Sequence, residues 1–135
     1  MPLTWTPDMT TGLADIDEQH RNVIAAVNGL DEEMAAGHSR EALTETLSSV
    51  ISYAAWHFAR EEECFTRYRC PAAAANIAHH KEFVAAVTSF RERLVVEGPT
   101  PELAGVLRTV LGPWLMDHIC KVDAKLATSV RAAAA

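Results

Sequence analysis

The chain has few of the residues that interrupt helices, because only 6 glycines and 6 prolines occur among its 135 residues. Its 3 cysteines are an odd number without a C-x-x-C pair, which excludes a disulfide framework and a cysteine zinc site. No stretch approaches the ~20 apolar residues that a membrane-spanning helix needs, so we expect no membrane partner. Basic residues are also scarce: 12 lysines and arginines against 18 acids give a net charge of −6, which argues against a nucleic-acid partner.

Alanine, in contrast, is abundant, with 23 residues. It has the highest intrinsic helix propensity, so together with the shortage of helix breakers it favours an all-α fold. The length fits a single domain over residues 1–135. The first residues lack the basic stretch and apolar run of an export signal, so we expect a cytoplasmic protein with reduced thiols.

Prolines, glycines and capping residues divide the chain into an arm, four helices and a tail. Pro2, Pro7 and Gly12 predict an irregular arm over residues 1–14, and the final alanines predict a frayed tail over residues 131–135. The predicted helices run from Asp15 or Asp17 to Gly37, from Ser39 to about Arg69, from Pro71 to Gly98 and from Thr100 to Val130. Each has one apolar stripe and the links are short, which predicts an up-down-up-down four-helix bundle.

Gly112-Pro113 interrupts the last predicted helix. A proline inside a helix removes one hydrogen bond and clashes with the preceding turn. We therefore expect a kink or break at about residues 109–113, followed by a firm helix from Trp114 to Val130.

Polar residues interrupt the apolar stripes. With about 100° of rotation per residue, six of them fall on the inner sides of the helices: His20, His57, Glu61, Asn76, His80 and His118. A single buried histidine is more often a core residue bonded to a main-chain carbonyl, but this set is spread over all four helices. A shared cation explains them together, because bundles build metal sites from side chains on facing helices. Imidazole with carboxylate suits iron, zinc or manganese.

Two familiar classes of metal site are absent from the sequence. No glutamate has a histidine three residues later, which excludes the ferritin-like di-iron pattern. The H-E-x-x-H pattern of metallopeptidases is missing as well. His57 and Glu61 lie four residues apart and so share one helix face, but that spacing alone is a weak signal.

Four segments together resemble the hemerythrin family, in particular its single-domain bacterial members, over roughly residues 5–126. The opening segment has Trp5, Gly12 and the I-D-x-Q-H pattern that ends at His20. The other three segments are His57-Phe58-x-x-Glu61-Glu62, Pro71 followed by His80-x-x-Phe83, and Trp114-x-x-x-His118-Ile119-x-x-x-Asp123.

The resemblance implies two iron ions with an oxo or hydroxo bridge, also bridged by Glu61 and Asp123. One iron would be bound by His20 and His57 and would keep an open coordination position. Dioxygen would bind at this position and leave it unchanged. The other iron would be bound by His80 and His118. The pocket implied over the open iron would be lined by Val23, Phe58, Trp114, Leu115 and Ile119. The apolar stripe alone does not predict Asp123, because five residues from His118 is about 140° around a helix.

Asn76 departs from the family pattern, whose third helix carries two histidines spaced H-x-x-x-H. His80 fits the second position, and Asn76 stands in the first. His79 lies about 100° from His80, so its side chain would need a π-bulge or a swung conformation to reach a metal. His79 in such a conformation, the amide of Asn76 or a water would complete the site. We expect this site to assemble but to carry oxygen poorly, and a centre with one iron, or with none in the purified protein, is the alternative.

The expected function is therefore dioxygen binding for storage, delivery or sensing, by a monomer that is more an oxygen-binding protein than an enzyme. A di-iron peroxidase or a scavenger of nitric oxide or peroxide is the alternative that the substitution at Asn76 favours. A bundle with a structural metal and a protein partner is the third hypothesis.

Overall fold

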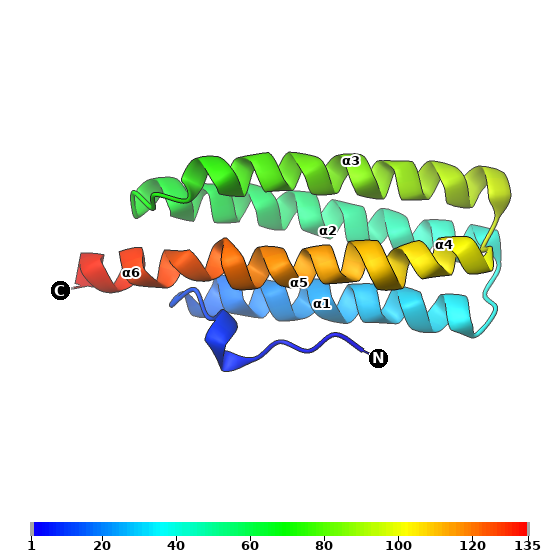
Figure 1. The fold of residues 1–135 in the computed structure, drawn as a ribbon, viewed down its shortest axis with the longest axis horizontal. Helices are drawn as coiled ribbons and strands as arrows, with labels where there is room; N and C mark the ends of the chain where they lie inside the picture. Colours follow the sequence, from blue (N-terminus) through cyan, green and yellow to red (C-terminus); the bar gives the residue numbers. More distant parts are fainter. Residues whose placement is uncertain (1, 135) are drawn as a thin grey trace.

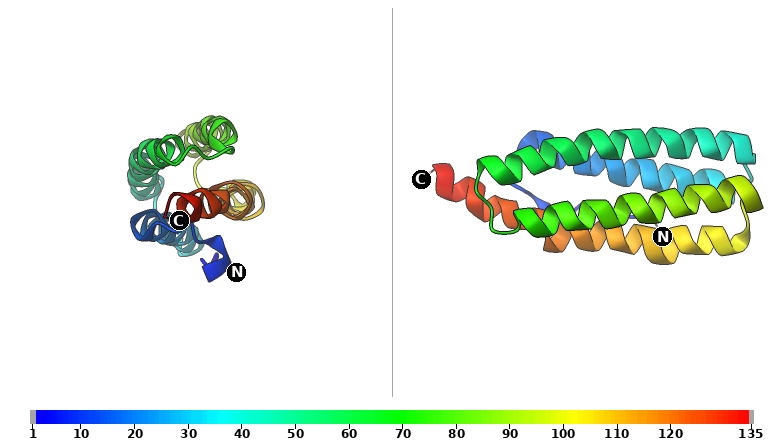
Figure 2. Two further views of the ribbon diagram at one scale, coloured as in Figure 1. Left: turned by 90° about the vertical axis from the view of Figure 1, so that its left-hand side faces the viewer. Right: turned by 90° about the horizontal axis from the view of Figure 1, so that it is seen from above.

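The computed structural model describes residues 2–134 and contains a four-helix bundle with alternating helix directions (Figure 1). The first three rods are α1 (Ala14–Ala35), α2 (Arg40–Arg67) and α3 (Ala73–Glu97). The fourth rod joins α4 (Pro101–Val106), a π-helical segment (Leu107–Leu111), α5 (Gly112–Lys121), a 3-10 turn (Asp123–Lys125) and α6 (Leu126–Ala134). The end-on view in Figure 2 shows the four rods around a common axis. The predicted all-α bundle is confirmed.

Most of the predicted helix ends are confirmed. Ser39 precedes α2 and its side chain accepts a hydrogen bond from the Ala42 N–H at 3.2 Å. Thr100 precedes α4 in the same way, with Pro101 at the first helical position. Gly98 ends α3 with a φ of 80°, in the left-handed region that glycine adopts without strain. Pro71 lies just ahead of α3, in the turn that links it to α2.

The prediction that Asp15 or Asp17 caps α1 is wrong. The helix begins at Ala14 with Leu13 at the N-cap, and the carboxylate of Asp17 turns back onto the arm. It accepts hydrogen bonds from the N–H of Thr11 at 2.8 Å, the hydroxyl of Thr11 at 2.8 Å and the hydroxyl of Thr10 at 2.5 Å. The first turn of α1 therefore holds the arm to the bundle.

The arm and the tail are more ordered than the sequence predicts. The arm contains a short 3-10 helix over Pro7–Met9, and nearer its start Asn28 bonds both the N–H and the carbonyl of Leu3. In place of a frayed tail, α6 remains helical to Ala134. Met1 and Ala135, which the predicted arm and tail include, lie outside the described residues.

The fourth rod stays helical through Pro113 without a break, and the irregularity predicted at residues 109–113 takes the form of a π-helical segment. The turn before Pro113 widens into the π-helical segment, so that the Gly112 N–H bonds to the carbonyl of Leu107, five residues earlier. The irregular hydrogen bonding thus begins ahead of the proline, where a regular turn would clash with its ring. The predicted firm helix from Trp114 to Val130 is wrong, because α5 ends at Lys121 and a 3-10 turn follows.

Two apolar clusters fill the bundle, one on either side of a polar layer. The larger cluster contains Phe58 of α2 and Ile119 of α5, and the smaller one contains Phe65 of α2 and Leu126 of α6. Glu61 lies between the two phenylalanines along α2, so the polar residues occupy the level between the clusters. Within residues 2–134, the helices are too short or too polar to cross a membrane.

The contacts of Asp17 with the arm lead to a prediction for the variant Asp17→Asn. A hydrogen bond to a charged group contributes about 1.5–3 kcal/mol, so we expect the free energy of unfolding to fall by about 1–3 kcal/mol. Urea denaturation of the metal-free protein measures it. Asp15→Asn is the control, because exposed Asp15 lies in the same first turn and loses the same interaction with the helix dipole. An equal loss in the two variants would contradict the assigned role of Asp17.

Candidate metal centre

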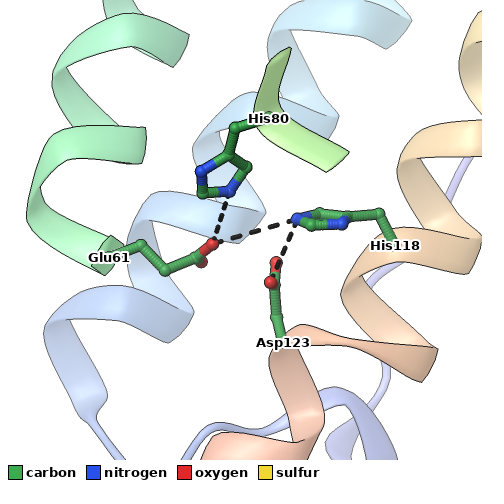
Figure 3. A group of neighbouring side chains, drawn as sticks. All are labelled: Glu61, His80, His118 and Asp123. Carbon is green, nitrogen blue, oxygen red and sulfur yellow. Dashed lines mark hydrogen bonds and ion pairs between the residues drawn. The ribbon is translucent and has the colours of Figure 1, made fainter. Parts of the chain in front are cut away.

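Seven polar side chains from all four rods meet between the apolar clusters, and each is at most 3% exposed. Figure 3 shows four of them pointing toward one another. The set consists of His20 from α1, His57 and Glu61 from α2, Asn76 and His80 from α3, His118 from α5 and Asp123 from the 3-10 turn.

The carboxylate of Glu61 lies at the middle of this set. Its Oε2 is 2.5 Å from Nε2 of His20 and 3.1 Å from Nε2 of His57. Its Oε1 is 2.9 Å from Nε2 of His80 and 3.9 Å from Nε2 of His118. The two oxygens of one carboxylate thus face two different pairs of imidazoles.

The carboxylate of Asp123 repeats this division. Its Oδ2 is 3.1 Å from Nε2 of His20, and its Oδ1 is 3.0 Å from Nε2 of His118. We call the set of His20, His57, Glu61 Oε2 and Asp123 Oδ2 the His20 half. The set of His80, His118, Glu61 Oε1 and Asp123 Oδ1 is the His80 half. Each half offers two imidazole nitrogens and two carboxylate oxygens.

Asp123 reaches the centre because the helix stops just before it. At Val122 the backbone changes to a φ of −109° and a ψ of −59°, and a 3-10 turn begins. A continuous helix would place Asp123 about 140° away from His118. With the break, both side chains point to the same spot.

Asn76 belongs to the His80 half. Its amide nitrogen donates hydrogen bonds to Glu61 Oε1 and to Asp123 Oδ1, both at 2.8 Å. Its own oxygen is buried and has no hydrogen-bond partner in the described part of the chain. Asn76 therefore stands beside both carboxylates, at the position where the family pattern has a histidine.

His79 does not replace the missing imidazole. Its Nδ1 lies 3.3 Å from Nδ1 of His118, whereas the Nε2 of His118 faces the carboxylates. The two groups of potential metal ligands found among residues 2–134 do not include His79. The ring of His79 instead contacts His118 from outside the centre.

Two more side chains hold the imidazoles from outside, and the sequence did not reveal either of them. Nδ1 of His57 lies 2.8 Å from Oε1 of Gln19, and Nδ1 of His80 lies 2.8 Å from Oε2 of Glu62. Such contacts orient the ring so that Nε2 faces the metal site. Both residues occur in the family motifs next to an expected ligand, and that adjacency was the available signal.

The charges in the metal-free centre balance one another. Burial by itself lowers the pKa of His20, but contacts with Asp123 and Glu61 outweigh it and raise that pKa to about 10. The same opposition raises the pKa of His118 to about 9. Burial would raise the pKa of Glu61, yet the surrounding histidines, His118 and His20 first, hold it well below its usual value. Buried imidazolium and carboxylate groups thus pair where a cation would otherwise lie.

The donor set fits a pair of iron ions. Buried polar atoms without a hydrogen-bond partner are rare in proteins. Among residues 2–134, Nε2 of His118 and Oδ2 of Asp123 make the ion-pair contacts given above but no hydrogen bond, and Oδ1 of Asn76 has no hydrogen-bond partner either. Cations held between the imidazoles and carboxylates would satisfy the first two atoms directly. Nitrogen and oxygen donors without a thiolate are ligands that iron accepts.

The five side chains expected to form an oxygen pocket all lie in or against the larger apolar cluster. Four of them are buried, and Trp114 is half-buried. Phe58 stacks on the ring of His80 with centroids 3.9 Å apart, and Trp114 stacks on His118 at 5.0 Å. The aromatic members therefore contact the imidazoles of the His80 half.

Comparison with known proteins agrees with this architecture. Residues 11–129 match the hemerythrin HHE cation binding domain. The chain is 33% identical over 130 residues to a bacteriohemerythrin of Stenotrophomonas maltophilia, in a match that covers 96% of this chain and 82% of that protein. It is 27% identical to a bacteriohemerythrin of Methylococcus capsulatus, with coverage of 90% and 91%. A crystal structure of wild-type hemerythrin matches with a TM-score of 0.79 and 25% identity over 96% of this chain and 98% of that one. The chain belongs to the hemerythrin family.

Proposed function

We propose that this chain holds two iron ions, joined by an oxo or hydroxo bridge, and uses them to bind dioxygen reversibly for storage, delivery or sensing. The observation that carries the proposal is the pair of carboxylates, Glu61 and Asp123, each with one oxygen toward each pair of imidazoles. A single cation would leave half of this arrangement unused. The proposed ligands are His20, His57, Glu61, His80, His118 and Asp123.

The protein supplies position, and the metal supplies the redox chemistry. When bound, the iron pair provides the electrons and the open coordination position that dioxygen requires. His20 and His57 hold one half from α1 and α2, and His80 and His118 hold the other from α3 and α5. Gln19 and Glu62 keep two of these rings turned toward the centre.

The apolar residues of the larger cluster that lie next to the metal centre would exclude water from it. A closed apolar wall prevents proton entry and side reactions at a redox site. We assign this role to the pocket set of Val23, Phe58, Trp114, Leu115 and Ile119. Leu115 and Ile119 come from α5, on the same helix as His118, so one helix contributes both ligand and wall.

An iron count on the air-exposed protein tests the proposal most directly. We expect two iron ions per chain, near-ultraviolet absorption bands of an oxo bridge, and a spectral change that reverses when oxygen is removed and readmitted. The zinc-loaded protein is the control and should show neither the bands nor the change. One iron per chain, or a spectrum indifferent to oxygen, would refute the proposed function.

The contact between Glu62 and His80 predicts an effect on metal retention. Loss of a side chain that orients a ligand typically lowers metal affinity by about 10–100-fold, so Glu62→Ala should release iron to a chelator faster by about tenfold or more. Glu63→Ala is the matched control, because Glu63 is the exposed neighbour on the same helix. If the two variants release iron equally fast, Glu62 does not support His80.

A second candidate function is the reduction of peroxide or nitric oxide. Asn76 favours it, because the His80 half has two imidazoles where the family pattern has three. A position not filled by imidazole leaves room for an added molecule to reach the metal. Turnover of peroxide with an electron donor would then accompany poor oxygen carriage.

The variant Asn76→His separates the two candidates. A third imidazole should fill the position, so we expect slower autoxidation and loss of most peroxide turnover, measured on protein with a matched iron content. Asn22→His makes the same chemical change on the exposed side of α1 and should alter neither rate. Unchanged autoxidation and iron retention in Asn76→His would rule out a role for Asn76 in either property.

A further inference from the structure

The amide of Asn76 occupies the carboxylate oxygens of one half of the centre. It is fully buried and donates to Glu61 Oε1 and Asp123 Oδ1, the two oxygens that belong to the His80 half. The His20 half uses the opposite oxygen of each carboxylate. Imidazole contacts with these carboxylates occur in both halves, whereas the amide contacts only the oxygens of the His80 half.

We propose that Asn76 imposes an order of metal loading, with the first cation bound in the His20 half and the second bound more weakly in the His80 half. The second cation must displace the amide from both carboxylates. This inference rests on the proposed two-metal function and names the residue that makes its two halves unequal. In the metal-free chain, the amide hydrogens occupy the place of the second cation's positive charge.

The amide can give way by turning over. Its oxygen is buried without a hydrogen-bond partner among the described residues, so the present orientation satisfies only the nitrogen. A half-turn about the last side-chain bond exchanges the two atoms and directs a neutral oxygen toward the His80 half. This rotation of the amide breaks two hydrogen bonds to charged acceptors, which are among the stronger hydrogen bonds in proteins. The affinity of the His80 half for a cation is therefore lowered, but binding is not prevented.

Titration of the metal-free full chain with Zn²⁺ tests the order of loading, because zinc needs neither oxygen nor a redox step. Calorimetry should resolve two steps of one equivalent each, the second weaker by about 10–100-fold. The side-chain amide of Asn76, followed by ¹⁵N NMR, should stay protected from exchange after the first equivalent and lose protection after the second. His57→Ala should weaken the tight step, and His80→Ala the weak one.

Variants of Asn76 identify the cause. Asn76→Leu has a similar volume but cannot donate, and Asn76→His restores the imidazole of the family pattern; in both, the two steps should approach each other. Asn22→Leu is the control and should keep them apart. Circular dichroism of the metal-free variants identifies any that fail to fold, in which case the wild-type titration and the amide signal decide.

Several results would overturn the inference. These are uptake of two equivalents in a single step by the wild type, loss of amide protection at the first equivalent, or steps that remain equally separate in Asn76→Leu. Uptake of one equivalent by both the wild type and Asn76→His would do the same. Ordered zinc uptake without reversible oxygen binding would refute the proposed function alone, whereas equal uptake with reversible oxygen binding would refute the loading order alone.

Discussion

The buried carboxylate of Glu61 is the group on which the rest of the centre depends. It is fully buried, and an isolated charge at such a depth would be strongly unfavourable. Four imidazoles surround it, supplied by α1, α2, α3 and α5, so this set of contacts forms only when all four rods are in place. The same contacts that make a metal site thus also specify how the helices pack, and removal of the carboxylate would leave His20 and His118 paired with Asp123 alone.

The fourth rod shows that departures from regular helix serve the site. A continuous α-helix would carry Asp123 away from His118, and the break at Val122 returns it. The π-helical segment before Pro113 lets the rod continue as a helix past the proline, and α5 brings Leu115, His118 and Ile119 to the core. Two local irregularities, one on each side of α5, therefore align one helix with the other three.

Helical periodicity and local capping chemistry could be predicted from the sequence, whereas contacts between distant side chains could not. Apolar stripes were sufficient to place His20, His57, His80 and His118 on inner faces, and capping chemistry identified Ser39 and Thr100. Asp123 required the family resemblance, because a helix break has no periodic signal. The local position of Asp17 indicated a cap, but its partners, Thr10 and Thr11, lie in the arm before the helix. The ring contacts made by Gln19 and Glu62 depend on side-chain orientations that no spacing encodes.

The substitution at Asn76 changes the metal-free protein as much as the loaded one. An imidazole at this position would add another group that must lose its proton before it binds a metal, whereas an amide stays neutral and donates to both carboxylates at once. The metal-free centre is consequently held together by its own hydrogen bonds, with the carboxylates already oriented for bridging. The same bonds oppose the second cation. The hydrogen bonds that order the metal-free centre thus also weaken binding of the second cation. Asn76 favours an ordered metal-free centre over tight binding of both cations.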